Sequence, residues 1–394
     1  MDMSRLKKVD NNYLEIILVN PEDLLTVKER LFVHDPLLLP ALRRLQREAD
    51  EALNLGPFSV VNKVQVPPSG DKHDYMSLAK YWWPNPVTPN GLPYIRRDGE
   101  TNPDANRQDK FDRKTLGLMI KTVTTLALAY LLVEEESYAV HASELLKTWF
   151  LYPDTRMNPN LKYAQAIPGA VDGRGTGIID SRGFAKIIDA VGMLQGSTSW
   201  TPQNHQALKV WFSEYLDWLI NSKNGQDEAN AANNHGTMYD FQVSALALFT
   251  GNIDLARKTI LKSRIKRIAS QIEPDGSQPL ELARTKGLDY SVLNLTGLLN
   301  LTLLGRHIGI NLGEYCTDDG RSIRSALEWI TPYLLTPEDW PYKQIVPYQQ
   351  ESAYHLFKLA AVCYEDDQFE KYIHKLTIKK KEDNRLNLLY PSKV

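Results

Sequence analysis

From residue 111 onward, apolar residues recur every three to four positions, which is the period of an α-helix with a buried face. In residues 237–249 the repeat is carried by Met238, Phe241, Ala245, Leu248 and Phe249. The pattern predicts an all-α fold in which antiparallel helix pairs wind into an incomplete (α/α) toroid or barrel. The predicted helices span residues 36–54, 115–132, 138–150, 184–194, 202–220, 237–249, 253–272, 291–304, 323–335 and 351–364.

Two long irregular stretches interrupt this pattern. Residues 71–110 contain five prolines between positions 84 and 103, and residues 152–182 contain four glycines between positions 169 and 177. Loops of such length in a compact domain are usually functional or disordered. The first stretch is too aromatic for disorder, because it carries Tyr75, Tyr81, Trp82, Trp83 and Tyr94. Before it, residues 59–66 are short and β-branched.

No stretch has the composition of a linker between domains. We therefore expect one toroid domain over residues 1–394, with an N-terminal helical part (1–58), a core (59–312) and C-terminal helices (313–394). No strict internal repeat is present, which argues against a regular solenoid.

The composition narrows the classes of function. With 43% hydrophobic and 24% charged residues, the chain has the make-up of an ordinary soluble globular protein. A net charge of −2 argues against nucleic-acid binding, although a local basic cleft would still accept an acidic polymer. Cys316 and Cys363, the two cysteines, provide no disulfide framework. No apolar run is long enough to span a membrane, and residues 1–10 lack the apolar core of a signal peptide.

One junction between a loop and a helix concentrates polar side chains. Residues 221–228 (NSKNGQDE) form a polar run that we interpret as poor in helix, and residues 233–240 read NNHGTMYD. Asn233, Asn234 and His235 then lie in the first turn of a core helix, where the helix dipole favours an anion. This position suits a carboxylate held beside a proton-transfer group. The alternative is an asparagine N-cap followed by a structural histidine.

A second polar cluster also precedes an apolar helix. Residues 273–279 (EPDGSQP) are a strong turn signal, and they lead into LELARTKGLDY at residues 280–290. Arg284 and Tyr290 are therefore expected at the same end of the fold as His235. The alternative is a surface ion pair for Arg284 and a half-buried Tyr290.

Together these residue types meet the needs of β-elimination from a uronic-acid polymer. The carboxylate beside the reacting carbon must be neutralised, a base must take the C5 proton, and an acid must protonate the leaving oxygen. Asn234 and Arg284 suit the first task, since such donors are worth about 10²–10³ in rate. His235 suits the base and Tyr290 the acid. Tyr290 would also serve as base if nearby cations such as Arg284 lowered its pKa.

The motifs resemble those of the alginate-lyase superfamily of helical-toroid polysaccharide lyases, in its smaller single-domain branch of alginate and glucuronan lyases. The resemblance rests on NNHGTMYD, on PDGSQPLELART at 274–285 with Tyr290, on YWWPNP at 81–86 and on GLPYIRRDG at 91–99. It covers roughly residues 59–312 and implies metal-independent elimination without a cofactor. Asn234 and Arg284 would neutralise the carboxylate, while His235 and Tyr290 would transfer protons.

The resemblance also implies the partner, an acidic polysaccharide: mannuronate-rich alginate first and glucuronan second. The oligomeric state stays open, and we expect a periplasmic or secreted enzyme. Arginine and lysine would pair with substrate carboxylates, and tryptophan would stack on sugar rings. The alternative for each such residue is a solvated charge or a core side chain. The substrate-binding candidates are Asn233, Tyr239, Gln165, Arg174, Arg182, Trp82, Trp83, Lys80 and Arg96.

Two other classes of function compete with the lyase. A uronic-acid-specific glycoside hydrolase on a similar barrel would need two carboxylates flanking the bond. Glu281, Asp289, Asp180 and Asp240 are available, but their spacing forms no recognisable acid–base pair. A non-catalytic polysaccharide-binding protein would need the aromatic and basic residues without a proton-transfer pair. A metal enzyme is weakly supported, because the histidines lack ligand spacing.

Overall fold

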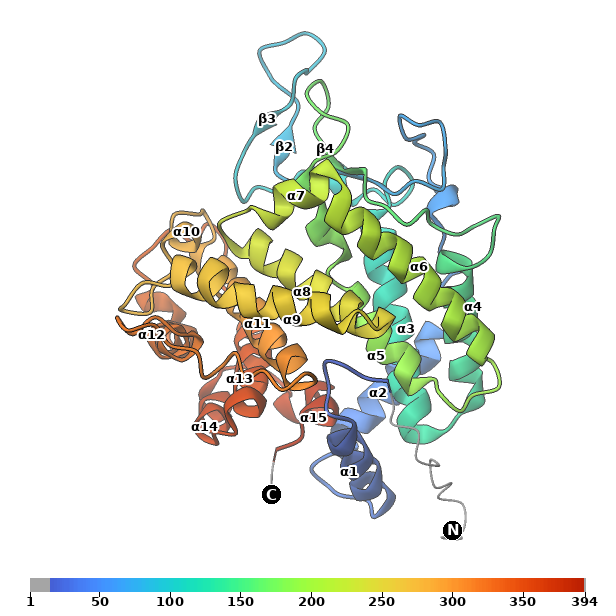
Figure 1. Cartoon of the computed structure of the whole chain (residues 1–394). Coiled ribbons are helices and arrows are strands. Elements are labelled where there is room, and N and C mark those ends of the chain that lie inside the picture. Colours follow the sequence, from blue (N-terminus) through green and yellow to red (C-terminus); the bar gives the residue numbers. More distant parts are fainter. Residues whose placement is uncertain (1–14, 393–394) are drawn as a thin grey trace.

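The computed structural model describes residues 15–392, and these form an all-α fold, as the apolar period predicts (Figure 1). Five helices make an inner layer in which each packs on the next: α3 (Arg113–Val133), α5 (Phe184–Met193), α8 (Asn234–Thr250), α11 (Gly287–Arg306) and α13 (Glu351–Tyr364). On its outside, α4 packs on α3, α6 and α9 on α8, α12 on α11, and α14 on α13. The α-helices are α1 Pro21–Phe32, α2 Leu39–Ala52, α3 Arg113–Val133, α4 Glu136–Phe150, α5 Phe184–Met193, α6 Pro202–Asn221, α7 Lys223–Ala229, α8 Asn234–Thr250, α9 Ile253–Ser263, α10 Pro279–Leu282, α11 Gly287–Arg306, α12 Ile323–Leu335, α13 Glu351–Tyr364, α14 Gln368–Lys375 and α15 Leu386–Leu389.

Helix α8 shows why the inner layer forms. Its residues are buried on every face except for His235, Leu248 and Thr250, and a helix covered all round belongs inside the protein. Gly236 is needed for this packing, because an added Cβ would lie 2.2 Å from the carbonyl oxygen of Ala231. The first turn of α8 therefore leaves one accessible side chain, that of His235.

Segments near both ends of the described part of the chain pack against the inner layer. Arg385 Nη1 donates to Thr125 Oγ1 of α3 at 2.9 Å, and Tyr354 of α13 donates to Asn387 Oδ1 at 2.6 Å. The segment at α15 therefore links the last inner helix to the first. The backbone N–H groups of residues 17–19 all donate to the carboxylate of Asp189 in α5.

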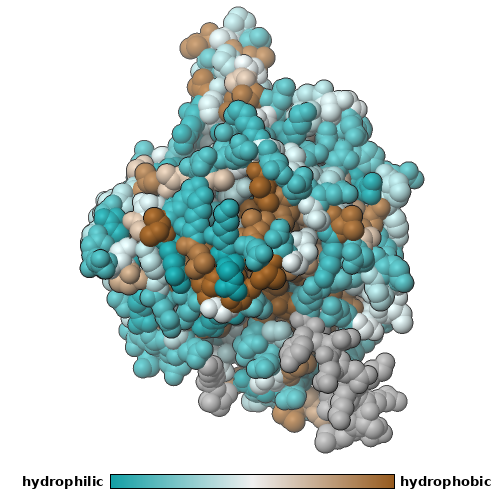
Figure 2. Space-filling view, in the orientation of Figure 1, coloured by the Kyte–Doolittle hydropathy of each residue, from teal (hydrophilic) through white to brown (hydrophobic). Residues whose placement is uncertain are grey.

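Four short strands lie in the two irregular stretches. Strand β1 (Met76–Leu78) pairs in parallel with β4 (Tyr163–Ala166), and β2 (Trp82–Trp83) pairs antiparallel with β3 (Ile95–Arg96). The loop between β2 and β3 projects beyond the helices (Figures 1 and 2). The glycine-rich stretch lies beside it, since the Tyr94 N–H donates to the Pro168 carbonyl at 3.0 Å.

Several local predictions were wrong. The polar run 221–228 is not poor in helix: it contains most of α7, which Ser222 caps by accepting from the Gly225 N–H. Residues 59–66, for which only the β-branched composition was noted, contain a 3₁₀ turn at Val60–Asn62. The predicted helix 253–272 is α9 followed by a π-helical turn, Arg264–Ala269. Helices α1, α14 and α15 were not predicted.

Helix α3 also corrects the expectation that no apolar run could span a membrane. Its 21 residues are long and apolar enough to do so by length and composition. Its packing against α2, α4 and α5 is that of a core helix. Cys316 and Cys363 are both free thiols, the first exposed and the second buried. Residues 1–10, assessed above for a signal peptide, lie outside the described residues.

Candidate active site

The start of α8 holds Asn233 and Asn234 in different roles. Asn233 is the N-cap, and its Oδ1 accepts from the His235 N–H at 3.3 Å. Asn234 is 1% exposed. Both its backbone N–H and its Nδ2 donate to the Glu281 carboxylate at 2.6 Å. Burial raises the pKa of Glu281, and the two bonds from Asn234 partly offset that rise. Asn234 is thus fixed in place, and Glu281 uses one of its two Nδ2 hydrogens.

His235 is oriented by a buried acid. Its Nδ1 lies 2.7 Å from Oε1 of Glu228, and the two side chains are 20% and 1% exposed. A carboxylate only accepts, so Nδ1 carries the hydrogen and Nε2 is the free ring nitrogen. Glu228 lies on α7, the helix missing from the sequence prediction. A fixed tautomer with a bare Nε2 is the arrangement that a general base requires.

Arg284 lies over the ring of Tyr290. Its guanidinium carbon is 4.0 Å from the ring centroid, and Nε and Nη2 donate to Asp98 at 3.1 and 2.8 Å. Asp98 also accepts from Arg96 at 2.9 Å and from the Thr285 hydroxyl at 3.0 Å. Burial opposes ionisation of Asp98, but the bonds from Arg284 and Arg96 prevail and hold its pKa well below the usual range. Asp98 thus fixes a cation against the aromatic ring.

Two tyrosines share a hydrogen bond at the centre of the site. The Tyr290 hydroxyl donates to the Tyr81 hydroxyl at 2.7 Å. Burial, and then this bond, raise the pKa of Tyr290 well above the usual range. Burial acts the same way on Tyr81, but the nearby Lys80, the bond from Tyr290 and Lys286 outweigh it and lower the pKa of Tyr81. Tyr290 therefore keeps its proton at neutral pH, as a general acid must.

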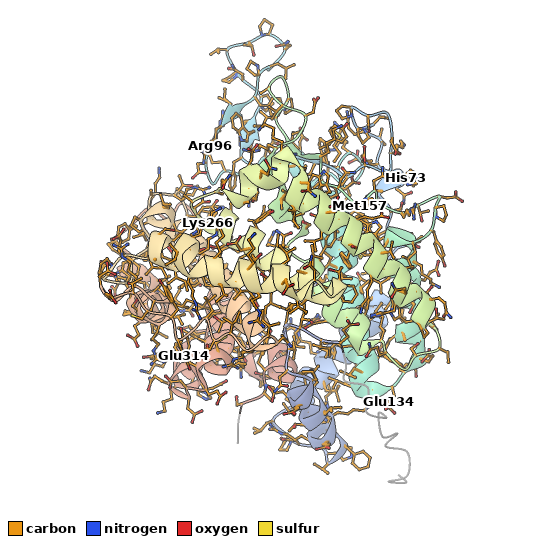
Figure 3. The ribbon with its side chains drawn as sticks, in the orientation of Figure 1. His73, Arg96, Glu134, Met157, Lys266 and Glu314 are labelled. Carbon is orange, nitrogen blue, oxygen red and sulfur yellow. The ribbon has the colours of Figure 1, made fainter. Side chains whose placement is uncertain are left out.

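The tryptophans of β2 are half-buried and carry arginine on their faces. Arg174 lies 5.9 Å from the ring of Trp82, and Arg97 lies 5.2 Å from the ring of Trp83. Strand pairing sets Trp82 opposite Arg96, which Figure 3 labels at the base of the projecting loop. Both predicted sugar-stacking residues, Trp82 and Trp83, therefore lie beside two of the predicted cations, Arg96 of β3 and Arg174 of the glycine-rich stretch.

Gln165 is held rigidly beside these residues. Its Nε2 donates to Asp180 at 3.1 Å, its Oε1 accepts from Arg174 at 3.1 Å, and its N–H donates to Ser77 at 2.8 Å. Its φ of +51° is a left-handed conformation that costs a non-glycine residue about 1–3 kcal/mol. Such strain persists where surrounding contacts impose it, and it is common at functional sites.

Among the described residues, two predicted binding residues form no side-chain hydrogen bond with this cluster. The Tyr239 hydroxyl is buried and donates to the Leu219 carbonyl at 3.1 Å, so it is not free to bind a substrate. Burial raises its pKa to about 12. Arg182 lies two residues before α5, and within residues 15–392 its guanidinium donates only to the Ile179 carbonyl, at 2.9 Å. Within residues 15–392, no three His, Cys, Asp or Glu side chains are placed to hold a metal ion.

A family model described as alginate lyase matches residues 59–340. The chain belongs to the alginate lyase family. The crystal structure of an alginate lyase from Bacteroides ovatus is 42% identical to this chain, with a TM-score of 0.92 over 96% of this chain and 99% of that one. A comparison with curated protein sequences found no match. The family and this neighbour identify the chain as a polysaccharide lyase, as the motifs predicted.

More distant structures share the fold of this alginate lyase family member. Alginate lyase A1-III from a Sphingomonas species is 13% identical, with a TM-score of 0.59 over 96% of both chains. An A1-III variant in complex with a tetrasaccharide is 14% identical, with a TM-score of 0.61 over 97% of this chain and 96% of that one. The all-α fold therefore persists at low sequence identity.

The carboxylates that a hydrolase would use are all engaged in this lyase. Glu281 binds Asn234. Asp289 accepts from Gln344, Asp180 from Tyr75, Ser77 and Gln165, and Asp240 from Arg267. Sequence reasoning missed the roles of Glu228 and Asp98, and it treated Glu281 only as a possible hydrolase acid. Asp98 lies within the GLPYIRRDG motif at residues 91–99, and that motif is the sequence signal that could have identified its role.

Proposed function

We propose that this lyase cleaves alginate by β-elimination, with mannuronate-rich polymer as the preferred substrate and glucuronan as the second. Support comes from one arrangement at the starts of α8 and α11. His235 has a free Nε2, and Tyr290 keeps its proton. Asn234 is anchored by Glu281, and Arg284 lies over the Tyr290 ring. Elimination needs these functions: a base, an acid and groups that neutralise a carboxylate.

The proposed reaction begins with charge neutralisation. The remaining Nδ2 hydrogen of Asn234 binds the carboxylate beside C5, and the Arg284 guanidinium adds positive charge next to it. This makes the C5 proton more acidic, because the charge that builds up on the carboxylate is stabilised. Nε2 of His235 takes the C5 proton. Its Nδ1–H bond to Glu228 stabilises the imidazolium that forms.

The leaving group departs with help from Tyr290. The electron pair of the broken C5–H bond forms a C4=C5 double bond, and the bond from C4 to the glycosidic oxygen breaks. Tyr290 gives its proton to that oxygen, which becomes the new hydroxyl of the released chain. Tyr81 accepts a hydrogen bond from Tyr290 in the free protein and therefore holds the phenol in position. In a competing assignment, Tyr290 acts as both base and acid.

The test is ultraviolet absorbance of the unsaturated uronate product on polymannuronate, polyguluronate and glucuronan. We expect the fastest rise on polymannuronate. Tyr290→Phe and His235→Asn should each lower kcat by about 10²–10⁴, the range for general acid–base groups. Tyr152→Phe is the matched control, since this exposed tyrosine bonds Glu144 of α4, which has no part in the proposed reaction, and the change should leave the rate unchanged.

The outcomes separate the remaining possibilities. Absorbance that rises first on glucuronan would replace the substrate assignment but keep the reaction. New reducing ends without absorbance would indicate hydrolysis instead. Binding of the polymers without turnover, equal in wild type and Tyr290→Phe, would indicate a binding protein. Full loss in Tyr290→Phe with only a small loss in His235→Asn would assign both proton transfers to Tyr290.

A further inference from the structure

Helix α5 contains an accessible lysine inside an otherwise buried helix. Every residue of α5 except Lys186 is buried, so neighbouring elements cover the helix on all sides. Lys186 nevertheless keeps exposed surface. That surface must therefore face a hollow within the helix layers rather than the outside of the protein. Burial, followed by the charges of Arg182 and Arg385, lowers the pKa of Lys186, as expected for a cation enclosed by protein.

Helix α3 forms a second wall of this hollow. A Cβ added at Gly117 would meet no atom within 4 Å, so open space adjoins the helix there. Lys121, one turn further on, is exposed and lines a cavity of about 190 Å³ with Arg44 and Glu48 of α2, Asn384 and Arg385. The two walls are adjacent, because a Cβ at Gly183 would lie 2.8 Å from Ile120 of α3.

Helix α13 supplies the third wall. The pKa of His355 falls to about 4, first because of burial and then because of the charge on Lys186. His355 therefore lies within electrostatic reach of Lys186 and is neutral at physiological pH. Since α3, α5 and α13 all belong to the inner layer, and the segment that holds Arg385 and Asn387 links α3 to α13, we place the hollow inside that layer.

The cations of this axial recess form no ion pair among the described residues, although Asp189 lies within electrostatic reach of Lys186 and Asp180 within reach of Arg182. Within residues 15–392, the side-chain amines of Lys186 and Lys121 make no hydrogen bond or ion pair, and the Arg182 guanidinium donates only to a backbone carbonyl. The nearby acids are already engaged. Asp189 binds the N–H groups of residues 17–19, Glu48 pairs with Arg44 and Arg385, and Asp180 accepts from Tyr75, Ser77 and Gln165. Enclosed, unpaired positive charge is costly, and an anion would remove the cost.

We propose that the axial recess, lined by Arg182, Lys186 and Lys121, binds the carboxylate of a uronate unit. This inference rests on the proposed function, which supplies the ligand class. The recess adjoins the catalytic cleft through hydrogen bonds: Asp180, two residues before Arg182, holds Gln165, which in turn accepts from Arg174. The uronate is either the distal end of a bound substrate chain or a released product, and both present the same carboxylate.

The first measurement uses the intact protein and does not depend on turnover. Thermal unfolding of wild type, Lys186→Met, Lys186→Arg and the control Lys258→Met, an exposed lysine on α9, is followed with glucuronate, mannuronate or glucose. Both uronates should raise the melting temperature of wild type, Lys258→Met and Lys186→Arg, but not of Lys186→Met, and glucose should have no effect. Without ligand, Lys186→Met should melt at the same or a higher temperature, because an unpaired cation has been removed.

The second measurement distinguishes the two sources of the carboxylate. If the substrate chain end enters the recess, Lys186→Met raises KM about tenfold for a hexamannuronate but leaves a trimannuronate unchanged. If product enters, Lys186→Met instead relieves inhibition by the unsaturated monouronate about tenfold at constant KM. Either result supports the recess.

The inference is overturned if uronates stabilise Lys186→Met as much as wild type, or if glucose stabilises wild type equally. Its failure is distinguishable from that of the proposed function. A wild-type protein that forms no unsaturated product but is stabilised by uronates through Lys186 would refute the proposed cleavage of alginate or glucuronan alone.

Discussion

Glu228→Gln tests the assignment of His235 most directly. The carboxylate of Glu228 is 1% exposed, its Oε1 accepts from His235 Nδ1, and its Oε2 has no hydrogen-bond partner. Glutamine keeps the shape and removes the charge. Its amide either accepts from Nδ1–H through oxygen or donates to Nδ1 through nitrogen. The second arrangement moves the imidazole hydrogen to Nε2, which then no longer acts as a base.

The expected loss follows from these two effects. A hydrogen bond to a charged group contributes about 1.5–3 kcal/mol and a neutral one about 0.5–1.5 kcal/mol. Loss of the charge therefore costs about 1–1.5 kcal/mol in stabilising the imidazolium of the transition state. Two amide orientations of similar energy reduce the reactive tautomer by a further factor of about two. Together they predict that kcat falls about 10- to 30-fold.

Glu228→Gln should affect the free energy of unfolding differently from the rate. Glu228 is a buried carboxylate with one unsatisfied oxygen, so replacing it with a neutral amide should leave the free energy of unfolding unchanged or raise it. Denaturant titration and product absorbance on the same preparations measure both quantities. Glu144→Gln, on the surface of α4, is the control. A loss in kcat below about twofold with folding intact would refute His235 as a proton-transfer group. A large loss of stability would show that the Glu228–His235 pair is mainly structural.

Three further predictions concern the partners of the site. Tyr81→Phe removes a bond that raises the pKa of Tyr290, so the alkaline limb of the pH–rate profile should move to lower pH, and an unchanged limb would exclude Tyr290 as the acid. Asp98→Asn frees Arg284 and should lower kcat/KM about tenfold. Because the pKa of Asp98 is lowered in the folded protein, its stabilising effect should be full at neutral pH and vanish in acid, which unfolding titrations at several pH values would check. Gly177→Ala places a Cβ 2.5 Å from strand β4 and should destabilise the fold by about 1–3 kcal/mol in denaturant titration; no loss would show that β4 moves freely.

The sequence was sufficient to predict the helices that pack through a regular apolar face. Helices α12 and α13 begin and end at the predicted residues. Ser322 caps the start of α12, and the apolar period stops at the last residue of each helix. The apolar period also placed Asn234 and His235 in the first turn of α8. These features depend on neighbours within a few residues, so a local pattern is sufficient to predict them.

Polar helices and short strands were harder to predict. Helix α7 has no apolar repeat, and it forms because Ser222 caps it and because its Gly225 and Glu228 are buried against neighbouring elements. A tertiary environment can stabilise a helix that its own sequence does not favour. Strands β1 and β4 likewise pair across more than eighty residues, and neither carries a strand-length apolar alternation.

The chemical identity of the site was decided by contacts between distant segments. His235 receives its acid from α7, Arg284 its carboxylate from the loop after β3, and Tyr290 its hydroxyl partner from Tyr81, 209 residues away in the chain. The residue types and motifs showed which groups could do the chemistry. Only the packing of the helices and loops determined which nitrogen of the imidazole is free, which tyrosine keeps its proton and which charges remain unpaired, because those properties depend on burial and neighbours rather than on order along the chain.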